Sequence, residues 1–108
     1  MTTRSLPLYI AHFTTAGALD VYTVPTGFIT IVKFLQVMNR TGAPADVKVI
    51  VKSPAAATTY WRYDPALADL ALLGGETWFV LDEGWKIRIQ TSAQPLDIII
   101  AGAVLPHP

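Results

Sequence analysis

The sequence contains no cysteine, which excludes a disulfide framework and any metal site built on thiolates. It has no excess of either charge, since eight lysines and arginines balance eight aspartates and glutamates. A neutral chain gives no electrostatic reason to expect nucleic acid or an anionic membrane as a partner. Pro25, Lys33 and Asp97 also interrupt the longest apolar runs before they reach the roughly 18 residues that a membrane-spanning helix needs. We therefore expect neither nucleic acid nor membrane as a partner.

What the chain has in excess is apolar side chains. Hydrophobic residues make up 52% of its 108 residues and charged residues only 15%, against about 25% in an average domain. The length predicts a single domain over residues 1–108. A domain of this size buries roughly 65% of the surface that its unfolded chain exposes. We expect neighbouring subunits to cover the apolar surface that is left over.

Chemically reactive side chains are sparse. The only histidines are His12 and His107, whereas a metal site needs three or four converging ligands. No serine lies in a G-x-S-x-G elbow, and Gly74-Gly75 lacks the lysine of a phosphate-binding loop. The sequence therefore predicts no metal site, no cofactor and no enzyme activity. Residues 39–41, Asn-Arg-Thr, fit an N-glycosylation acceptor, a pattern that is common by chance.

Period-two alternation marks two strands, in which we expect one face to be buried: Val47, Val49 and Val51 in the first, and Trp85, Ile87 and Ile89 in the second. Two further segments, 28–38 and 96–105, are apolar on both faces and must be covered on both sides. The remaining candidate strands are 8–14, 19–24, 58–63 and 77–81.

Turn signals rich in glycine and proline separate these segments. About eight short strands at this spacing predict an all-β fold, either an antiparallel β-sandwich that is jelly-roll-like or a small barrel, and we take the sandwich as the prediction. Residues 65–73 form the remaining segment, which the sequence predicts as a short helix or a loop. Asp64 suits a helix N-cap, Pro65 the first position of a helix and Gly74 its end.

Asp82 and Glu83 lie between two tryptophans, an arrangement that can belong to a glycosidase-like site or to a turn. Gly84 follows them, and a three-residue hairpin loop favours glycine at its left-handed third position. Adjacent acidic residues on a turn point apart and seldom converge on one substrate. We interpret this segment as a hairpin turn rather than a catalytic pair.

The aromatic cluster Tyr60, Trp61, Arg62 and Tyr63 is the candidate interaction site. Strand alternation predicts that Tyr60 and Arg62 point to one face and Trp61 and Tyr63 to the other. One pair can then fill the core while the other contacts a partner, since Tyr, Trp and Arg are enriched at binding hot spots. Packing under the neighbouring loop and stacking against a sugar are the alternatives.

Several motifs, in order, resemble the small β-sandwich virion proteins of tailed bacteriophages. They are V-Y-T-V-P-T-G-F-I-T-I-V at 21–32 with N-R-T-G at 39–42, Y-D-P-A-L at 63–67 with G-G-E-T at 74–77, and L-D-E-G-W-K-I-R-I at 81–89 with L-D-I-I-I-A-G at 96–102. The sequence departs from the family pattern at Trp85 and at its final A-V-L-P-H-P.

The resemblance implies a structural protein of a virion with no catalytic residues. The expected role is capsid decoration, that is, a cement protein on the capsid surface that docks on the major capsid protein and stabilises the head. A homo-oligomer is expected, with a trimer as the form suited to threefold lattice sites. A neck or tail subunit and a carbohydrate-binding β-sandwich module are the alternatives.

Overall fold

The protein is described from a computed structural model that covers residues 6–13, 17–55, 58–93 and 95–108, with the backbone alone described for 6–13 and 58–60. Within these residues every regular element is a β-strand. In chain order the strands are β1 (Leu6–Phe13), β2 (Gly17–Thr23), β3 (Phe28–Asn39), β4 (Ala45–Lys52), β5 (Thr58–Leu67), β6 (Leu72–Leu81), β7 (Lys86–Thr91) and β8 (Leu96–Pro106).

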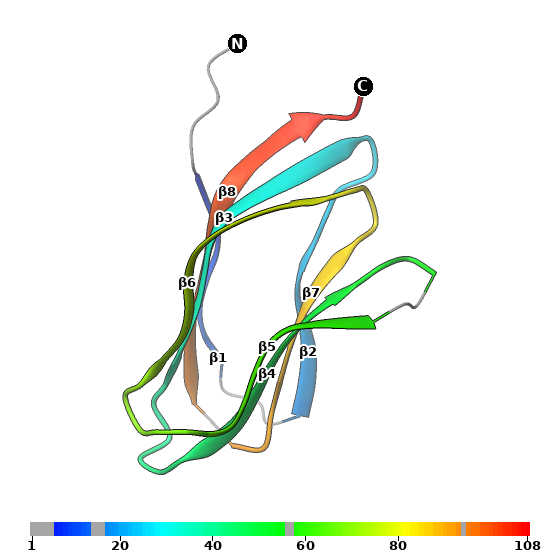
Figure 1. Ribbon diagram of the computed structural model, residues 1–108. Helices are drawn as coiled ribbons and strands as arrows, with labels where there is room; N and C mark the ends of the chain where they lie inside the picture. Colours follow the sequence, from blue (N-terminus) through cyan, green and yellow to red (C-terminus); the bar gives the residue numbers. More distant parts are fainter. Residues whose placement is uncertain (1–5, 14–16, 56–57, 94) are drawn as a thin grey trace.

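The strands form two four-stranded sheets that pack face to face (Figure 1). Sheet A has the order β1-β8-β3-β6 and sheet B the order β2-β7-β4-β5, and all neighbouring strands are antiparallel. The chain therefore pairs its first strand with its last, its second with its seventh, and so on inward to β4 and β5. This nested pairing is the jelly-roll arrangement, so the predicted fold class is confirmed.

The core lies between the four central strands of the two sheets. The residues with no exposed surface there are Val32, Leu35, Val37, Val47, Val49, Ile87, Ile89, Leu96, Ile98 and Ile100. Strand β7 shows how the sequence produces this core, because its side chains alternate strictly between half-buried and buried positions. The predicted burial of the β4 and β7 residues is confirmed, with one exception. Trp85 precedes β7 and is only half-buried, since it packs at the border of the core.

A register shift at Lys33 interrupts the pairing of β3 with both of its neighbours. It reverses the alternation of side chains along β3, which is why this long strand can look apolar on both faces in the sequence. Gly102 of β8 lies opposite Val32 of β3. A Cβ atom at position 102 would collide with the carbonyl oxygen of Ile31. The centre of sheet A therefore requires glycine at this position.

No helix forms at 65–73, so that part of the prediction is wrong. Strand β5 continues to Leu67, which is buried, and only the turn 68–71 separates it from β6. The Asp64 carboxylate accepts a hydrogen bond from the Ala66 amide, a local contact that does not begin a helix. Pro65 is tolerated because β5 lies at the edge of sheet B.

Candidate interaction surface

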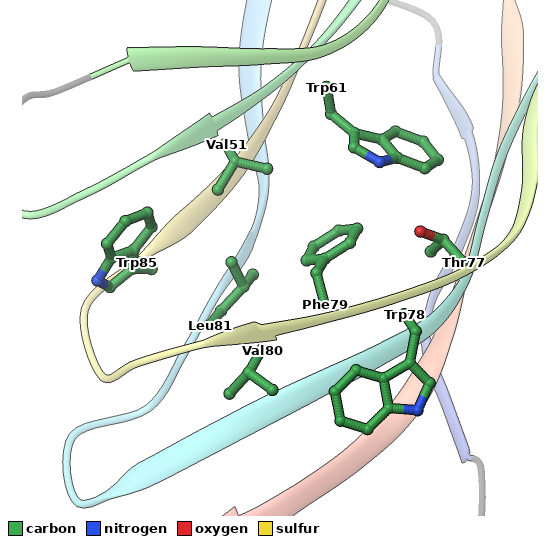
Figure 2. A pocket seen from close by; sticks show the side chains of 8 residues that line it. All are labelled: Val51, Trp61, Thr77, Trp78, Phe79, Val80, Leu81 and Trp85. Atoms are coloured by element: carbon green, nitrogen blue, oxygen red, sulfur yellow. The ribbon is translucent and has the colours of Figure 1, made fainter.

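An apolar groove opens between the sheet edges at β5 and β6 (Figure 2). Its volume is about 370 Å³, and it is lined by Val51, Trp61, Thr77, Trp78, Phe79, Val80, Leu81 and Trp85. Seven of these eight residues are apolar and none is charged. The groove exists because β5 and β6 belong to opposite sheets, so no hydrogen-bonded strand closes the sandwich on this side.

Trp61 forms the β5 wall of the groove and packs against Phe79 of β6. Their ring centroids are 5.7 Å apart and the planes are tilted by 53°. The Arg62 guanidinium lies over the outer side of the Trp61 ring, 4.4 Å from its centroid, and donates a hydrogen bond to the Trp61 carbonyl oxygen. At the groove, the aromatic contact between Trp61 and Phe79 thus connects the two sheets, and the Arg62 guanidinium packs on the Trp61 ring.

The predicted alternation along residues 60–63 is wrong. Arg62 pairs with Val49 and Tyr60 with Ile50, so Trp61 is an extra residue without a partner on β4. Such a bulge turns Trp61 into the groove instead of leaving it on the face of Tyr63. The side chain of Tyr60 lies outside the described residues.

Arg62 and Tyr63 are the described members of the cluster that reach solvent, and half of the surface of Tyr63 is exposed. The Tyr63 hydroxyl donates a hydrogen bond to the carboxylate of Asp46 at 3.1 Å, and the Lys48 amine lies 5.0 Å from the Tyr63 ring centroid. The cluster therefore divides between the groove wall, where Trp61 lies, and the outer rim of sheet B.

Sheets A and B have contrasting outer faces. On sheet B, Asp20 of β2 binds Arg88 of β7 at 2.7 Å and lies 3.7 Å from the Lys86 amine. The hydrogen bond from Arg88 lowers the pKa of Asp20, and the charges of Arg88 and Lys86 lower it further, against the opposing effect of partial burial. Lys48 and Lys52 of β4 add to this charged surface.

Sheet A instead presents apolar side chains to solvent. The charged residues of β3, β6 and β8 are Lys33, Glu76 and Asp97. Large apolar residues are exposed there, namely Trp78 at 67%, Val80 at 50%, Leu72 at 49% and Ile99 at 39%. Figure 2 shows Trp78 and Val80 on one side of the β6 backbone and Phe79 on the other. The predicted strands included Trp78, Val80 and Ile99 without assigning them to a common surface, and they left out Leu72 because the strand was predicted to begin at Thr77.

The acidic pair is at a corner between the sheets, not in a hairpin. Strand β6 belongs to sheet A and β7 to sheet B, so the hairpin prediction is wrong, although the positive φ expected of Gly84 is confirmed at 78°. The Asp82 carbonyl accepts the Trp85 amide across the turn. The Glu83 carboxylate accepts the Gly27 amide at 2.7 Å and so holds a second corner, between β2 and β3.

His107 lies next to these two corners and contacts both. Its Nε2 atom lies 2.9 Å from the Asp82 carboxylate, its Nδ1 atom 3.0 Å from the Pro108 carbonyl oxygen, and its backbone amide donates to the Gly27 carbonyl. Both ring nitrogens face acceptors, an arrangement that only the protonated ring can satisfy. The Pro108 carbonyl contributes most to raising the pKa of His107, the charges of Asp82 and Glu83 raise it further, and partial desolvation opposes them. The acids thus position the chain rather than act on a substrate.

Asn39, the possible glycosylation acceptor, is fully buried at the end of β3. Its amide nitrogen donates to the carbonyl oxygens of Ala43 and Leu67, and its oxygen accepts the Thr41 amide. A glycan at this nitrogen would displace both carbonyl partners. The folded protein therefore has no room for a modification at Asn39.

Among the described residues, no three acidic or histidine side chains come together to hold a metal ion. The side chain of His12 lies outside the described residues, so its predicted lack of a metal role is not tested. The described part of the chain also contains no helix that could cross a membrane.

No protein-family model and no curated protein matches the chain. Solved structures share its fold. A subunit of the disulfide-linked pili of Bacillus endospore appendages is 12% identical at a TM-score of 0.58, over 100% of this chain and 93% of that one. The Drosophila NLP core, described in connection with pentamer formation and histone binding, is 14% identical at a TM-score of 0.51, over 93% and 99%.

A viral coat protein is also similar in fold. The VP2 protein of infectious bursal disease virus, in derived T=1 particles, is 10% identical at a TM-score of 0.52. The likeness covers 98% of this chain but only 32% of VP2, so the chain spans about a third of that protein. At these identities the likenesses show the fold alone. Structural subunits of capsids and pili are among the proteins that share it.

Proposed function

We propose that this protein is a structural subunit of a virion and that it acts by docking through the outer face of sheet A. The observation that carries the proposal is the exposed apolar row of Leu72, Trp78, Val80 and Ile99 on that face. Such a row, beside a sheet B that is covered with charge, marks a side of the molecule made for protein contact. The shared fold of a viral coat protein supports a structural role.

Within this role we propose capsid decoration in a tailed phage, with the major capsid protein as partner and the capsid surface as location. The ordered motifs of the sequence support this assignment. Arg62 and Tyr63, exposed on β5, remain proposed contact residues at the rim of the groove. A neck or tail position is the next candidate, and a trimer is the proposed stoichiometry on a threefold site.

The open aromatic groove favours a second candidate function, a carbohydrate-binding module. Trp61 and Trp85 offer flat rings for stacking. A sugar also needs several polar groups that fix its hydroxyls, and the only polar side chain in the lining is Thr77. The groove therefore suits apolar side chains better than it suits a sugar.

Purified particles test the proposal. Mass spectrometry and imaging should find this chain on heads, and particles that lack it should assemble but rupture at a lower temperature. Adding the purified protein should restore them, since a bound subunit stabilises the intact shell by mass action. Trp78→Ser should abolish this rescue, whereas Lys48→Ser on sheet B should not. Detection in tails alone would contradict decoration, and glycan binding by a protein absent from particles would contradict the virion role.

A further inference from the structure

The four edge strands of the sandwich differ in how they are protected against pairing with another chain. Edge strands of stable proteins are usually blunted by proline, by charged residues or by bulges. Strand β1 contains Pro7 with a register shift beside it. Strand β2 carries Asp20 next to a register shift. Strand β5 has Pro65, Arg62 and two register shifts.

Strand β6 has one charge and one register shift, as β2 does, but it is longer than β2. It is ten residues long, contains no proline or basic residue, and has Glu76 as its only charge. Within the described structure it pairs only with β3, so the other edge of its backbone is open. One register shift, opposite Lys33, is its only irregularity of pairing. A long apolar strand with an open edge is a template for strand addition.

We propose that a second copy of this chain occupies that edge, with β6 of one subunit antiparallel to β6 of the other about a two-fold axis. The inference rests on the proposed structural role, because it supplies the contact by which such a subunit associates. An antiparallel pair of identical strands is self-complementary, as a two-fold contact must be. The strand has no lysine or arginine, so no pair of like positive charges opposes the contact.

The groove gives an independent reason for a second copy rather than an isolated peptide. A two-fold axis perpendicular to sheet A places both sheet B layers on the same side of the joined sheet. The two grooves then face each other, and the walls formed by Trp61, Phe79 and Trp85 close over a shared apolar space. Pairing two subunits about this two-fold axis would therefore cover the open backbone edge of β6 and both grooves.

The size of the contact fits a stable dimer. A ten-residue strand is roughly 33 Å long, and the two packed layers beside it give this side on the order of 600 Å². The projecting side chain of Trp78 and the side chains of the groove walls add contact area. The total then approaches the ~800 Å² per partner of standard interfaces. The two-fold contact cannot lie inside the trimer proposed above, and the two contacts together would give a hexamer in which β6 pairs join two trimers.

Sedimentation of the purified protein tests the pairing, with matched lysine substitutions as the comparison. Val80 and Leu19 are both apolar, about half exposed and on edge strands, at β6 and β2. Val80→Lys should raise the dissociation constant of the dimer at least about tenfold, since it adds one like charge from each subunit to the paired strands. Leu19→Lys should leave it unchanged. A monomer at all concentrations, or equal effects of the two substitutions, would overturn the proposal.

The absence of native cysteine allows a direct map of the contact. Single cysteines placed in turn at residues 76–80 should form disulfide-linked dimers at one position, where the two-fold axis brings a residue opposite its own copy. Cysteines at Leu19 and Arg62, on the other edges, should remain reduced. Cross-linking through those controls instead would reject the β6 contact.

The pairing and the proposed function fail in different experiments. If Val80→Lys yields a monomer that still restores particle stability, the dimer is real but is not needed for docking. If the dimer forms and the chain is absent from particles, the virion role is wrong and the contact stands.

Discussion

The amide nitrogen of Asn39 lies 2.8 Å from the carbonyl oxygen of Leu67, although 28 residues separate them. The same nitrogen reaches the Ala43 carbonyl at 2.7 Å, and the Leu67 contact is buried while the Ala43 contact is partly buried. One buried side chain thus joins the end of β3, the start of the β3–β4 turn and the end of β5. Asn39, which resembles a glycosylation site in the sequence, therefore connects the two sheets by hydrogen bonds.

Asn39→Ala should lower the free energy of unfolding by about 1–3 kcal/mol, because it leaves the buried Leu67 carbonyl without its donor and also removes the contact to the Ala43 carbonyl. Thr41→Ala is the matched control. It also destroys the N-x-T pattern but removes only an exposed hydroxyl contact to Ala43, so its cost should stay below about 1 kcal/mol. Urea titrations of both variants would show equal losses if Asn39 had no structural role.

Ile87→Ala should cost about 2–5 kcal/mol, since Ile87 is fully buried between the sheets and its truncation leaves a cavity. Ile99→Ala removes the same atoms from the outer face of sheet A, where 39% of the side chain is exposed. That variant should lose about half a kcal/mol or less in the monomer. Denaturation curves that ranked the two the other way would reject the assignment of the inner face.

Gly84→Ala should destabilise the protein by more than the roughly 1 kcal/mol that a positive φ alone costs. A Cβ atom at this position would lie 2.8 Å from Cγ of Pro54. Gly42 has a similar φ of 88° but open space around it, so Gly42→Ala isolates the backbone strain. The difference between the two melting temperatures should shrink in a Pro54→Ala background. A difference that persists there would mean that Pro54 is not the obstacle.

The contact between His107 and Asp82 should make stability depend on pH near neutrality. The folded protein raises the pKa of His107, so the stabilisation is complete below the unfolded value of about 6.5 and is lost as pH rises through the folded value. His107→Gln should therefore flatten the melting temperature between about pH 6 and 8.

Asp20 provides the contrast, because its pKa is lowered. Its contribution is present above the unfolded value of 3.8 and is lost only as pH falls through the lower folded value. Asp20→Asn should thus remove a constant amount of stability across the neutral range and change the pH dependence only at the acid limb. A changed pH dependence of Asp20→Asn near neutrality, or an unchanged one of His107→Gln, would contradict these assignments.

The sequence was sufficient for the fold where each strand has one buried and one solvated face. Val47 and Ile87 obey strict alternation, and both are buried as predicted. The two edge strands at the groove were harder to predict, since Pro65 in β5 and Gly74-Gly75 in β6 are turn residues in most contexts. An edge strand tolerates them because only one side of its backbone must pair.

The candidate interaction surface was even harder to predict from local sequence patterns. Residues 60–63 were identified by composition alone, but a bulge at Trp61 decides which side chains reach the groove, and pairing with β4 produces that bulge. Similarly, the glycine of the D-E-G turn was predictable, whereas the destination of the turn was not. Whether Gly84 leads to a neighbouring strand or to the opposite sheet depends on pairings across the whole chain.

Strand β1 begins opposite the second half of β8, with Leu6 paired to Gly102, and β8 continues to Pro106 beside β3 (Figure 1). Tension applied between Leu6 and Gly102 would act on the first rung of the ladder and open its hydrogen bonds one after another, as a zipper opens. A push or pull spread across the sheet faces would instead load many rungs at once. Mechanically, then, the sandwich is weakest along a line through this first pair and strongest through its flanks. A shell that swells under internal pressure would hold such a subunit securely only by its flanks.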